Sequence, residues 1–438
     1  MFKTNNKTFL LLILTLAILI ILLMGSVNAV DQTITNTTSG GLRIAIDNVG
    51  NGQTIYLENG EYSGVNNANL TISKNLTISG KGSNVVIDAK GIGNIFTISS
   101  GVTVTLKNLK LINGYNYPDI VYECYGGAIN NNGSLSVSNC NFIDNNASAR
   151  GGAIYNNGSL SVSNCTFTNN RASHVGGAIY SDGRLSVSNC VFTNNKVSGS
   201  GGAIYGGNPY VSNCNFTGNR ASREGGAIGG KKSSVSNCTF TSNQAYFGGA
   251  IDGNKLSVSN CTFISNRAKY GGAIDGGRLF SMISCIFTKN TATSYGGAII
   301  GQNIAVSSSK FTNNQAKIGG ALYVSGAYST RDVLRLNSVT FKNNLVDNNS
   351  YSTIYLRMYK TKSYEVTKIK KQGIYHQVTV KNTGKRAIGN KFYIGIYVGE
   401  KQIKKLLIKS LMTGKSRIVQ VLKRPENKLK IFKVRNKY

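Results

Sequence analysis

The sequence has few of the residues that enzymes most often use for acid–base and metal chemistry. Its 438 residues include two histidines, 17 acidic residues, three prolines and no tryptophan. His174 and His376 lie far apart in the chain, so a histidine-based triad or metal cluster is not expected. The motifs HExxH, CxxC and GxSxG and the P-loop are absent as well. We therefore expect no metal site and no cofactor.

The scarcity of acidic residues leaves a net charge of +32, which is unevenly distributed. Residues 345–438 hold 23 lysines and arginines against four acids. Such a basic segment favours acidic envelope polymers or anionic lipid head groups as partners. Nucleic acid is not expected, because no nucleic-acid-binding motif is present.

The only long apolar run is at the start of the chain. Residues 1–29 combine two lysines, an apolar run from Phe9 to Met24 and the small-residue ending Val27-Asn28-Ala29. This pattern is typical of a cleaved secretory signal peptide, and the run is short for a membrane anchor. The sequence therefore predicts an exported mature chain without a transmembrane span, located at the cell surface or outside the cell.

A repeat of 23 to 25 residues occupies the middle of the chain. Gly-Gly-Ala occurs nine times between residues 126 and 321, and a Phe-x-x-Asn mark follows each copy in phase. Self-similarity at such a period indicates a stacked solenoid. Within a copy, Leu160-Ser161-Val162-Ser163 alternates apolar and polar residues, which is the period of a β-strand.

These features predict an all-β chain. We expect residues 30–345 to form a right-handed parallel β-helix of about 12–13 coils, with about three short strands in each coil. Residues 41–49 should form a short amphipathic helix that caps the open end. Asn170 and its counterparts should occupy turns in the left-handed conformation, and the paired glycines a tight turn.

The repeat GGAIxxxGxLSVSNCxFxxN resembles those of polymorphic outer-membrane proteins and of the secreted adhesin-like proteins of methanogenic archaea. The first coils resemble pectin-lyase-like β-helices. The resemblance covers residues 41–345 and implies the fold more strongly than an activity, because related proteins include both enzymes and binding proteins. The pectate-lyase pattern of calcium-binding aspartates with a catalytic Arg or Lys cannot be matched here.

Seven of the eight cysteines occupy one position in consecutive coils, from Cys140 to Cys285. Stacked residues have parallel Cβ vectors at about 4.8 Å, a geometry that does not suit a disulfide or a tetrahedral metal site. We expect these cysteines to pack as small apolar residues. Disulfides are the alternative that the secretory context suggests.

Two rows of outward positions are candidates for chemistry. The position after GGAI places Asp252 and Asp275 in neighbouring coils, and a close carboxylate pair can bind a cation or serve as general acid and base. The alternative is a solvated pair beside Lys255 and Arg278, which we favour. Catalytic residues are therefore not assigned beyond these two candidates.

The second row precedes each glycine pair. Phe247, Tyr270 and Tyr295 should stack on one another, with Tyr246 and Lys269 beside them. Exposed aromatic rows can stack on sugar rings, which makes these five residues the candidate ligand-binding site. Simple packing of one turn against the next is the alternative.

The repeat ends near Asn344. Residues 346–363 should form a closing coil or linker, and residues 364–438 a small, basic β-sandwich. The segment VKNTGKRAIGNKFYIGIYV followed by LMTGKS is similar to the CARDB-type immunoglobulin-like modules of surface proteins. The end of the chain is short for such a module, so the module is expected to be incomplete.

Together these observations favour a secreted, adhesin-like surface protein that binds a cell-wall or host glycan or an acidic envelope polymer without catalysis. Peripheral association with the envelope would follow from the basic C-terminal segment. The alternatives are a polysaccharide lyase or glycoside hydrolase acting along the coils, and a purely structural surface component.

Overall fold

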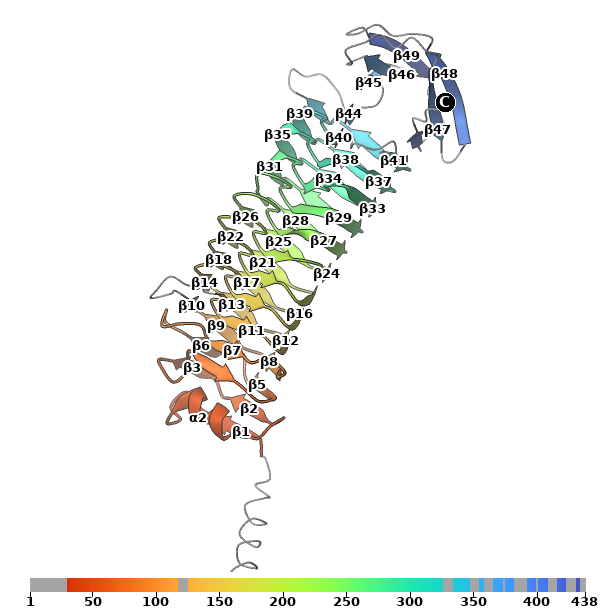
Figure 1. The fold of residues 1–438 in the computed structure, drawn as a ribbon. Coiled ribbons are helices and arrows are strands. Elements are labelled where there is room, and N and C mark those ends of the chain that lie inside the picture. The colour runs from red at the N-terminus through yellow and green to blue at the C-terminus, as the bar shows by residue number, and fades with distance from the viewer. Residues whose placement is uncertain are drawn as a thin grey trace, which may run out of the picture.

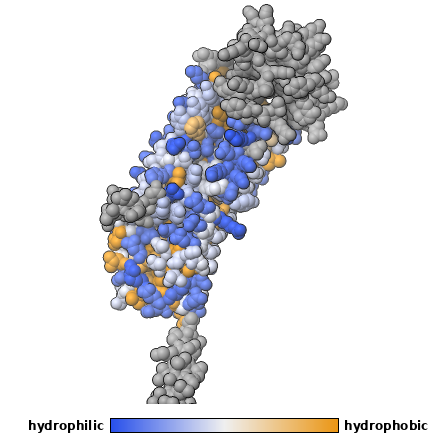
Figure 2. All heavy atoms as spheres, in the orientation of Figure 1, coloured by the Kyte–Doolittle hydropathy of each residue, from blue (hydrophilic) through white to orange (hydrophobic). Residues whose placement is uncertain are grey.

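The computed structural model describes residues 30–116, 125–325 and 334–346, and beyond them the backbone of the strands between residues 354 and 433. Parallel strands stack coil upon coil into a β-solenoid of about 12 turns (Figure 1). The predicted solenoid is thus confirmed. Figure 2 shows a mostly hydrophilic surface over the coils, as expected for a fold whose apolar residues point inward.

One coil shows how the repeat folds. It consists of β15 (Ile154–Asn156), β16 (Ser159–Ser163), β17 (Thr166–Thr168) and β18 (Arg171–Ala172). This coil has four strands, whereas the coil with β29 (Ile251–Ser259), β30 (Thr262–Ile264) and β31 (Arg267–Tyr270) has three, so the expectation of about three strands holds for some coils only. The two-residue strand β18 is too short to show a period in the sequence, which is why the pattern did not reveal it.

The strands stack into three surfaces. The largest, sheet A, contains two strands of most coils, one on each side of a corner. Its first row consists of β4 (Leu70–Ile72), β7 (Phe96–Ile98), β11 (Ile129–Asn131), β15, β19 (Ile179–Ser181), β23 (Ile204–Gly206), β32 (Ile274–Asp275), β36 (Ile299–Gly301), β40 (Leu322–Ser325) and β44 (Ile354–Arg357). Its second row consists of β1 (Gln32–Ile34), β2 (Thr54–Leu57), β5 (Leu76–Gly80), β8 (Thr103–Lys107), β12 (Ser134–Ser138), β16, β20 (Arg184–Ser188), β24 (Tyr210–Ser212), β33 (Leu279–Ile283), β37 (Ile304–Ser307) and β41 (Arg335–Asn337). In two coils a single long strand belongs to both rows, β27 (Ile228–Ser236) and β29 (Ile251–Ser259).

Sheet B follows the next corner and has 12 strands. They are β3 (Gly60–Ser63), β6 (Val85–Asp88), β9 (Lys110–Ile112), β13 (Asn141–Ile143), β17, β21 (Val191–Thr193), β25 (Asn215–Thr217), β28 (Thr239–Thr241), β30 (Thr262–Ile264), β34 (Ile286–Thr288), β38 (Lys310–Thr312) and β42 (Thr340–Lys342). The narrow third surface, sheet C, has two parts. They consist of β10 (Tyr115–Asn116), β14 (Asn146–Ala147), β18, β22 (Lys196–Val197) and β26 (Arg220–Ala221), and of β31 (Arg267–Tyr270), β35 (Thr291–Tyr295), β39 (Gln315–Ile318) and β43 (Leu345–Val346).

The corners use left-handed residues, but not the asparagine that the sequence suggested. Asn164 and Asn169 have φ of 53° and 58°, and Gly151 of the glycine pair has φ of 67°. Asn170, by contrast, has no positive φ and is completely buried. The prediction of a left-handed turn at Asn170 is therefore wrong by one residue, since Asn169 makes the turn and Asn170 points into the core.

The buried asparagines form a continuous row of amides along the solenoid. Asn170 Nδ2 donates to Asn195 Oδ1 in the next coil at 3.0 Å and to the carbonyl of Phe142 in the preceding coil at 3.0 Å. Its Oδ1 accepts the backbone N–H of Asn145 at 3.1 Å. The same pattern repeats from Asn145 to Asn344. These polar groups are buried at low cost because they are hydrogen-bonded.

A row of phenylalanines packs beside the amides. Rings in successive coils stack with centroids 4.6–5.1 Å apart from Phe142 to Phe341. Each ring from Phe142 to Phe311 is completely buried. In an earlier coil Leu111 pairs with Phe142, so Leu109-Lys110-Leu111 occupies the position that Cys-x-Phe has in later coils.

The cysteine row contains no disulfide in the described coils. All seven cysteines from Cys140 to Cys285 are free and buried. Each thiol does more than fill space: Cys214 Sγ lies 3.0 Å from the Ser212 carbonyl and accepts the backbone N–H of Cys190 at 3.4 Å. Where serine replaces cysteine, Ser309 Oγ makes the equivalent two bonds. Burial raises the pKa of Cys285 to about 11. Cys124 lies outside the described residues.

The predicted capping helix is present as α2 (Gly41–Asn48). Leu42, Ala45 and Ile46 are buried against the first coil, and Asn67 Oδ1 accepts the backbone N–H of Leu42 at 3.0 Å. The helix therefore covers apolar residues that the end of the stack would otherwise expose.

Strands beyond the solenoid pair antiparallel. One set joins β45 (Glu365–Gln372), β46 (Tyr375–Lys381) and β49 (Ser416–Leu422), and the other joins β47 (Phe392–Val398), β48 (Lys401–Ile408) and β50 (Ile431–Lys433). The division at residues 346–363, the β-sandwich and its CARDB-like character remain predictions. The signal peptide of residues 1–29 lies outside the described residues.

Substituting one member of the amide row should destabilise the solenoid strongly. Asn219→Ala removes the partners of the Phe192 carbonyl and of the Asn195 side chain and backbone N–H. Orphaned buried groups cost about 1–3 kcal/mol each, so we expect a loss of about 3 kcal/mol in the free energy of unfolding. Urea denaturation would measure it. Asn215→Ala, at an exposed position of the same coil, should change the midpoint little, and equal effects of the two variants would contradict the role of the amide row.

Candidate functional site

The aromatic row predicted from the sequence is present where the coil turns at the glycine pair. The rings of Phe247 and Tyr270 stack with centroids 5.2 Å apart, and those of Tyr270 and Tyr295 are tilted at 5.4 Å. Tyr323 extends the row, with its ring 4.7 Å from that of Tyr295. Phe247, Tyr270 and Tyr295 are half-buried, and each has a ring face stacked on a neighbouring ring.

The side chain of Lys269 contacts its aromatic neighbours. Its Nζ donates to the Tyr246 hydroxyl at 2.8 Å and lies 4.8 Å from the centre of the Tyr246 ring and 5.5 Å from that of Tyr270. Tyr246 is 41% exposed. The structure thus brings all five predicted ligand-binding residues together, and much of their contact is with one another.

The two aspartates are also neighbours. Asp252 and Asp275 are Cα partners on the parallel strands β29 and β32, and both are half-buried. Burial raises the pKa of Asp252 well above its usual range, and the charges of Asp275 and Glu224 raise it further. Burial raises the pKa of Asp275 to about 6, while the Gly277 N–H at 3.2 Å lowers it and Glu224 raises it.

This environment differs from the solvated pair that we expected beside Lys255 and Arg278. Neither carboxylate takes part in an ion pair within the described coils. Both carboxylates are half-buried, and burial raises the pKa of each. Their use as a cation or acid–base site stays a prediction. Among the described residues, no group of three or more His, Cys, Asp or Glu side chains could hold a metal ion.

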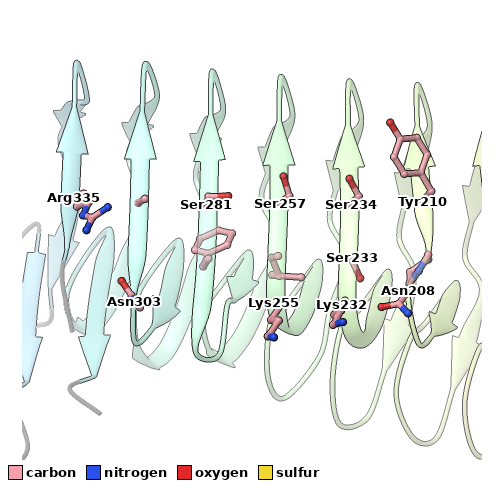
Figure 3. Close-up of a pocket in the computed structure, with 14 residues that line it drawn as sticks. Asn208, Tyr210, Lys232, Ser233, Ser234, Lys255, Ser257, Ser281, Asn303 and Arg335 are labelled. Carbon is pink, nitrogen blue, oxygen red and sulfur yellow. The ribbon is translucent and has the colours of Figure 1, made fainter. Parts of the chain in front are cut away.

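A groove that the sequence reading missed lies on the outer face of the second row of sheet A. Its volume is about 590 Å³, and it crosses the coils from Tyr210 to Arg335. Figure 3 shows Ser234, Ser257 and Ser281 in one row across successive strands, with Tyr210 at one end and Arg335 at the other. The registers of the strands confirm that these residues and Ala305 are successive Cα partners.

The groove exists because side-chain volume is lost at a corner of the coil. In earlier coils this corner holds the buried amides of Asn131 and Asn156, which bond each other at 2.6 Å. In the five coils beginning at 201 to 296 the position is glycine, as in Gly206 and Gly230, and in the coil at 319 it is Val324. Three residues later in the coil at 201 Pro209, and then Ser233 in the next, replace the buried leucine of earlier coils, for example Leu185.

Ser233 contributes a buried hydroxyl group to the groove. Its side chain is only 4% exposed, and its Oγ has no hydrogen-bond partner. A buried hydroxyl without a partner costs free energy, so a ligand or water that bonds it would be favoured. Pro209, Leu256 and Phe280 give the groove an apolar floor around this hydroxyl.

The rim of the groove is basic and aromatic. Lys232, Lys255 and Arg335 are exposed, and Tyr210 is 56% exposed. The lining contains no Asp, Glu or His. A second hollow of about 420 Å³ continues it and shares Ser257, Ser281 and Arg335. Across five coil spacings the row is about 24 Å long, which suits an oligomer rather than a single small molecule.

The sequence did contain a signal for this groove. The spacing from the isoleucine of GGAI to the cysteine shortens by one residue in the coils beginning at 201, 225 and 248. The first two of these coils also replace the leucine of the Gly-Ser-Leu pattern, with Pro209 and Ser233, whereas the third keeps it as Leu256. Regular positions of a repeat pack one coil on the next, so a break in the pattern indicates where the surface changes.

Among the described residues, no helix is long and apolar enough to span a membrane.

Comparison with known proteins supports the fold. The sequence pattern of the right-handed beta helix region matches residues 151–314 and 203–371, which together span about half of the chain. No curated protein matches the chain in sequence.

Similar solved structures include a PL6 alginate lyase in complex with a trisaccharide, with a TM-score of 0.47, 15% identity, and coverage of 76% of this chain and 84% of that chain. The ORF18 protein of Geobacillus virus E2 gives a TM-score of 0.38 and 13% identity, over 91% and 78% of the two chains. A mutant tailspike protein of E. coli bacteriophage HK620, in complex with a hexasaccharide, gives 0.34 and 13%, over 90% and 87%. Similarity this low carries no argument about activity.

Removing one charge from the aspartate pair should stabilise the protein near neutral pH. In the folded state the pKa of Asp275 is about 6, above the value of about 3.9 in an unfolded chain. Below about pH 4 the Asp275 carboxyl is neutral in both states, and its burial does not weaken the fold. As the pH rises through about 6 the carboxyl ionises in the folded state, and this stability is lost. Asp275→Asn should raise the free energy of unfolding by about 2–3 kcal/mol near pH 7.

Urea denaturation near pH 4 and near pH 7 tests this. The midpoint of the variant should change less between the two pH values than that of the unsubstituted protein. Asp144→Asn, at an exposed turn position, should keep the original pH dependence. An Asp275→Asn variant with unaltered pH dependence would show that the pair is solvated after all.

Proposed function

Because the chain belongs to the right-handed β-helix family, we propose that its coils form a rigid support for glycan binding and that the protein is an adhesin-like component of the cell surface. The observation that carries the proposal is the groove from Tyr210 to Arg335. It combines an exposed aromatic ring, a row of hydroxyls and a buried unpaired hydroxyl, which together match the apolar faces and hydroxyls of sugars.

The groove supports binding better than catalysis. Its lining lacks a carboxylate or imidazole, the groups most used for acid–base catalysis. Lys232 and Lys255 are exposed, whereas a lysine acts as a general base when burial favours its neutral form. The aspartate pair lies at the glycine turn, outside the groove lining, so a hydrolase that uses Asp252 and Asp275 would need a separate substrate site.

Two variants test the groove. Tyr210→Ala removes the aromatic wall, and Ser233→Leu restores the leucine of earlier coils and fills the hollow. Loss of a stacking ring costs about 0.5–1.5 kcal/mol, so Tyr210→Ala should weaken binding up to about tenfold. Ser233→Leu should abolish binding while leaving the urea midpoint unchanged or higher. Binding would be measured by fluorescence polarisation with labelled oligosaccharides from polygalacturonate, mannan and laminarin.

Tyr246→Ala is the matched control, since it removes an exposed aromatic side chain from the row at the glycine turn. Unchanged binding in both groove variants, with a loss in Tyr246→Ala, would transfer the site to that row. The same reactions should be followed for newly released sugar ends. Release that disappears in the double variant Asp252→Asn with Asp275→Asn would establish a glycoside hydrolase or lyase in place of a binding protein.

Retention at the envelope is proposed to depend on the basic C-terminal segment. Replacing Lys404, Lys405, Lys428 and Lys430 with glutamine should reduce retention of residues 30–438 on isolated cell walls and make it less sensitive to salt, since exposed charges are screened by salt. Sedimentation of the walls at low and high salt measures this. Retention that is unaltered at low salt would contradict the proposal.

A further inference from the structure

A column of positive charges follows sheet C along the solenoid. Arg171, Lys196 and Arg220 are direct Cα partners on β18, β22 and β26. Gln244 and then Arg267 continue the column through isolated bridges. All five side chains are exposed, and Arg171, Lys196 and Arg220 repeat at the coil spacing of about 4.8 Å, while Arg267 lies two spacings beyond Arg220.

The described structure offers nothing that neutralises this column. Like charges directly opposite each other on neighbouring strands are destabilising. None of the ion pairs of the described residues includes these cations. Asp144 lies at the turn two residues before β14, in the coil that precedes Arg171, and Glu224, four residues after Arg220, accepts a hydrogen bond from Ser200 at 3.3 Å. The column therefore costs stability that a ligand could offset.

The column is held rigidly and lies apart from the groove. Ala172, Val197 and Ala221, which alternate with the cations, form a buried cluster beneath them. In Figure 1 the strands of sheet C lie on one side of the solenoid and β24 and β27 on the other, with sheet B between them. A ligand on the column would thus not compete for the groove.

We propose that this column binds a linear acidic polysaccharide laid parallel to the solenoid axis. Guanidinium groups pair with carboxylates through two hydrogen bonds, and a row of them matches a polymer that carries one carboxylate on each sugar. The exposed hydroxyls of Ser173, Ser198 and Ser222 follow the cations two residues later and can bond sugar hydroxyls.

The neighbours of the column favour a polysaccharide over a nucleic acid. Single-stranded nucleic acids are bound by combining cations with aromatic rings on which the bases stack. Between Arg171 and Arg220 the flanking exposed residues include Ser173, Asn194 and Ser198, and one ring, the imidazole of His174. A single ring does not form the row on which successive bases stack. The column and its neighbours therefore offer a ligand mainly positive charges and hydroxyl groups.

Site-specific labelling tests the proposal. The exported chain, residues 30–438, is acetylated at its lysines with and without polygalacturonate, and mass spectrometry follows each lysine. Lys196 should be protected by the polymer, whereas exposed Lys107 and Lys310 should not. Fully methyl-esterified polygalacturonate has the same backbone without the charge and should give no protection.

Charge variants complete the test. The double variant Arg171→Gln with Arg220→Gln should remove the protection of Lys196 and lower the slope of log affinity against log salt by about one to two. Arg184→Gln with Lys310→Gln removes the same charge elsewhere and should leave the protection intact. Tyr210→Ala should also leave it intact, which separates this column from the groove.

Three results would overturn the proposal. Lys196 could be acetylated equally with and without the polymer. The esterified polymer could protect it as well as the acid form does. Finally, single-stranded DNA at equal charge concentration could protect it better than polygalacturonate, which would assign the column to nucleic acid.

Discussion

The solenoid depends on one constraint, the exact superposition of each coil on the next. The buried amides from Asn145 to Asn344 impose it, because each finds its partners only when the neighbouring coil is in register. A slip of one residue would point the amides to solvent and the outward side chains into the core. The stacked phenylalanine rings and the thiols, whose second bond also crosses to the neighbouring coil, satisfy the same register.

Because the register is fixed, the surface is organised in columns. A residue type that recurs at an outward position becomes a row with a regular spacing, and a change in one coil becomes a local break in that row. The serine row between Tyr210 and Arg335, the cations on sheet C and the aromatic row at the glycine turn are three such columns. The three columns therefore lie on different sides of the solenoid. The position of each column along the axis depends on which coils carry its residues.

The sequence predicts the solenoid, its cap and the neighbours in each column, because all of these follow from a repeat that is visible in the residues. It predicts less where the outcome depends on volume or solvent. Asn169 and Asn170 are adjacent asparagines of the same type, and only the folded chain shows that the first turns and the second is buried. Asp252 and Asp275 were correctly placed side by side, but their partial burial depends on the folded surroundings, which no motif displays. The groove was missed because it results from what is absent, the amide and leucine side chains that Gly206 and Ser233 do not supply.

The amide row has a direction. From Asn145 to Asn314 each amide amino group donates to the asparagine oxygen of the following coil, so from Asn170 to Asn344 each oxygen faces the preceding coil. The side-chain dipoles therefore align head to tail over nine asparagines, and hydrogen bonds in such a chain polarise and strengthen one another. When a newly synthesised coil stacks on the C-terminal end, the amino group of the last asparagine already points toward the place that the new asparagine oxygen will take. The solenoid is in this sense a template that can be copied coil by coil from its N-terminal cap, in the same order in which a ribosome delivers the chain.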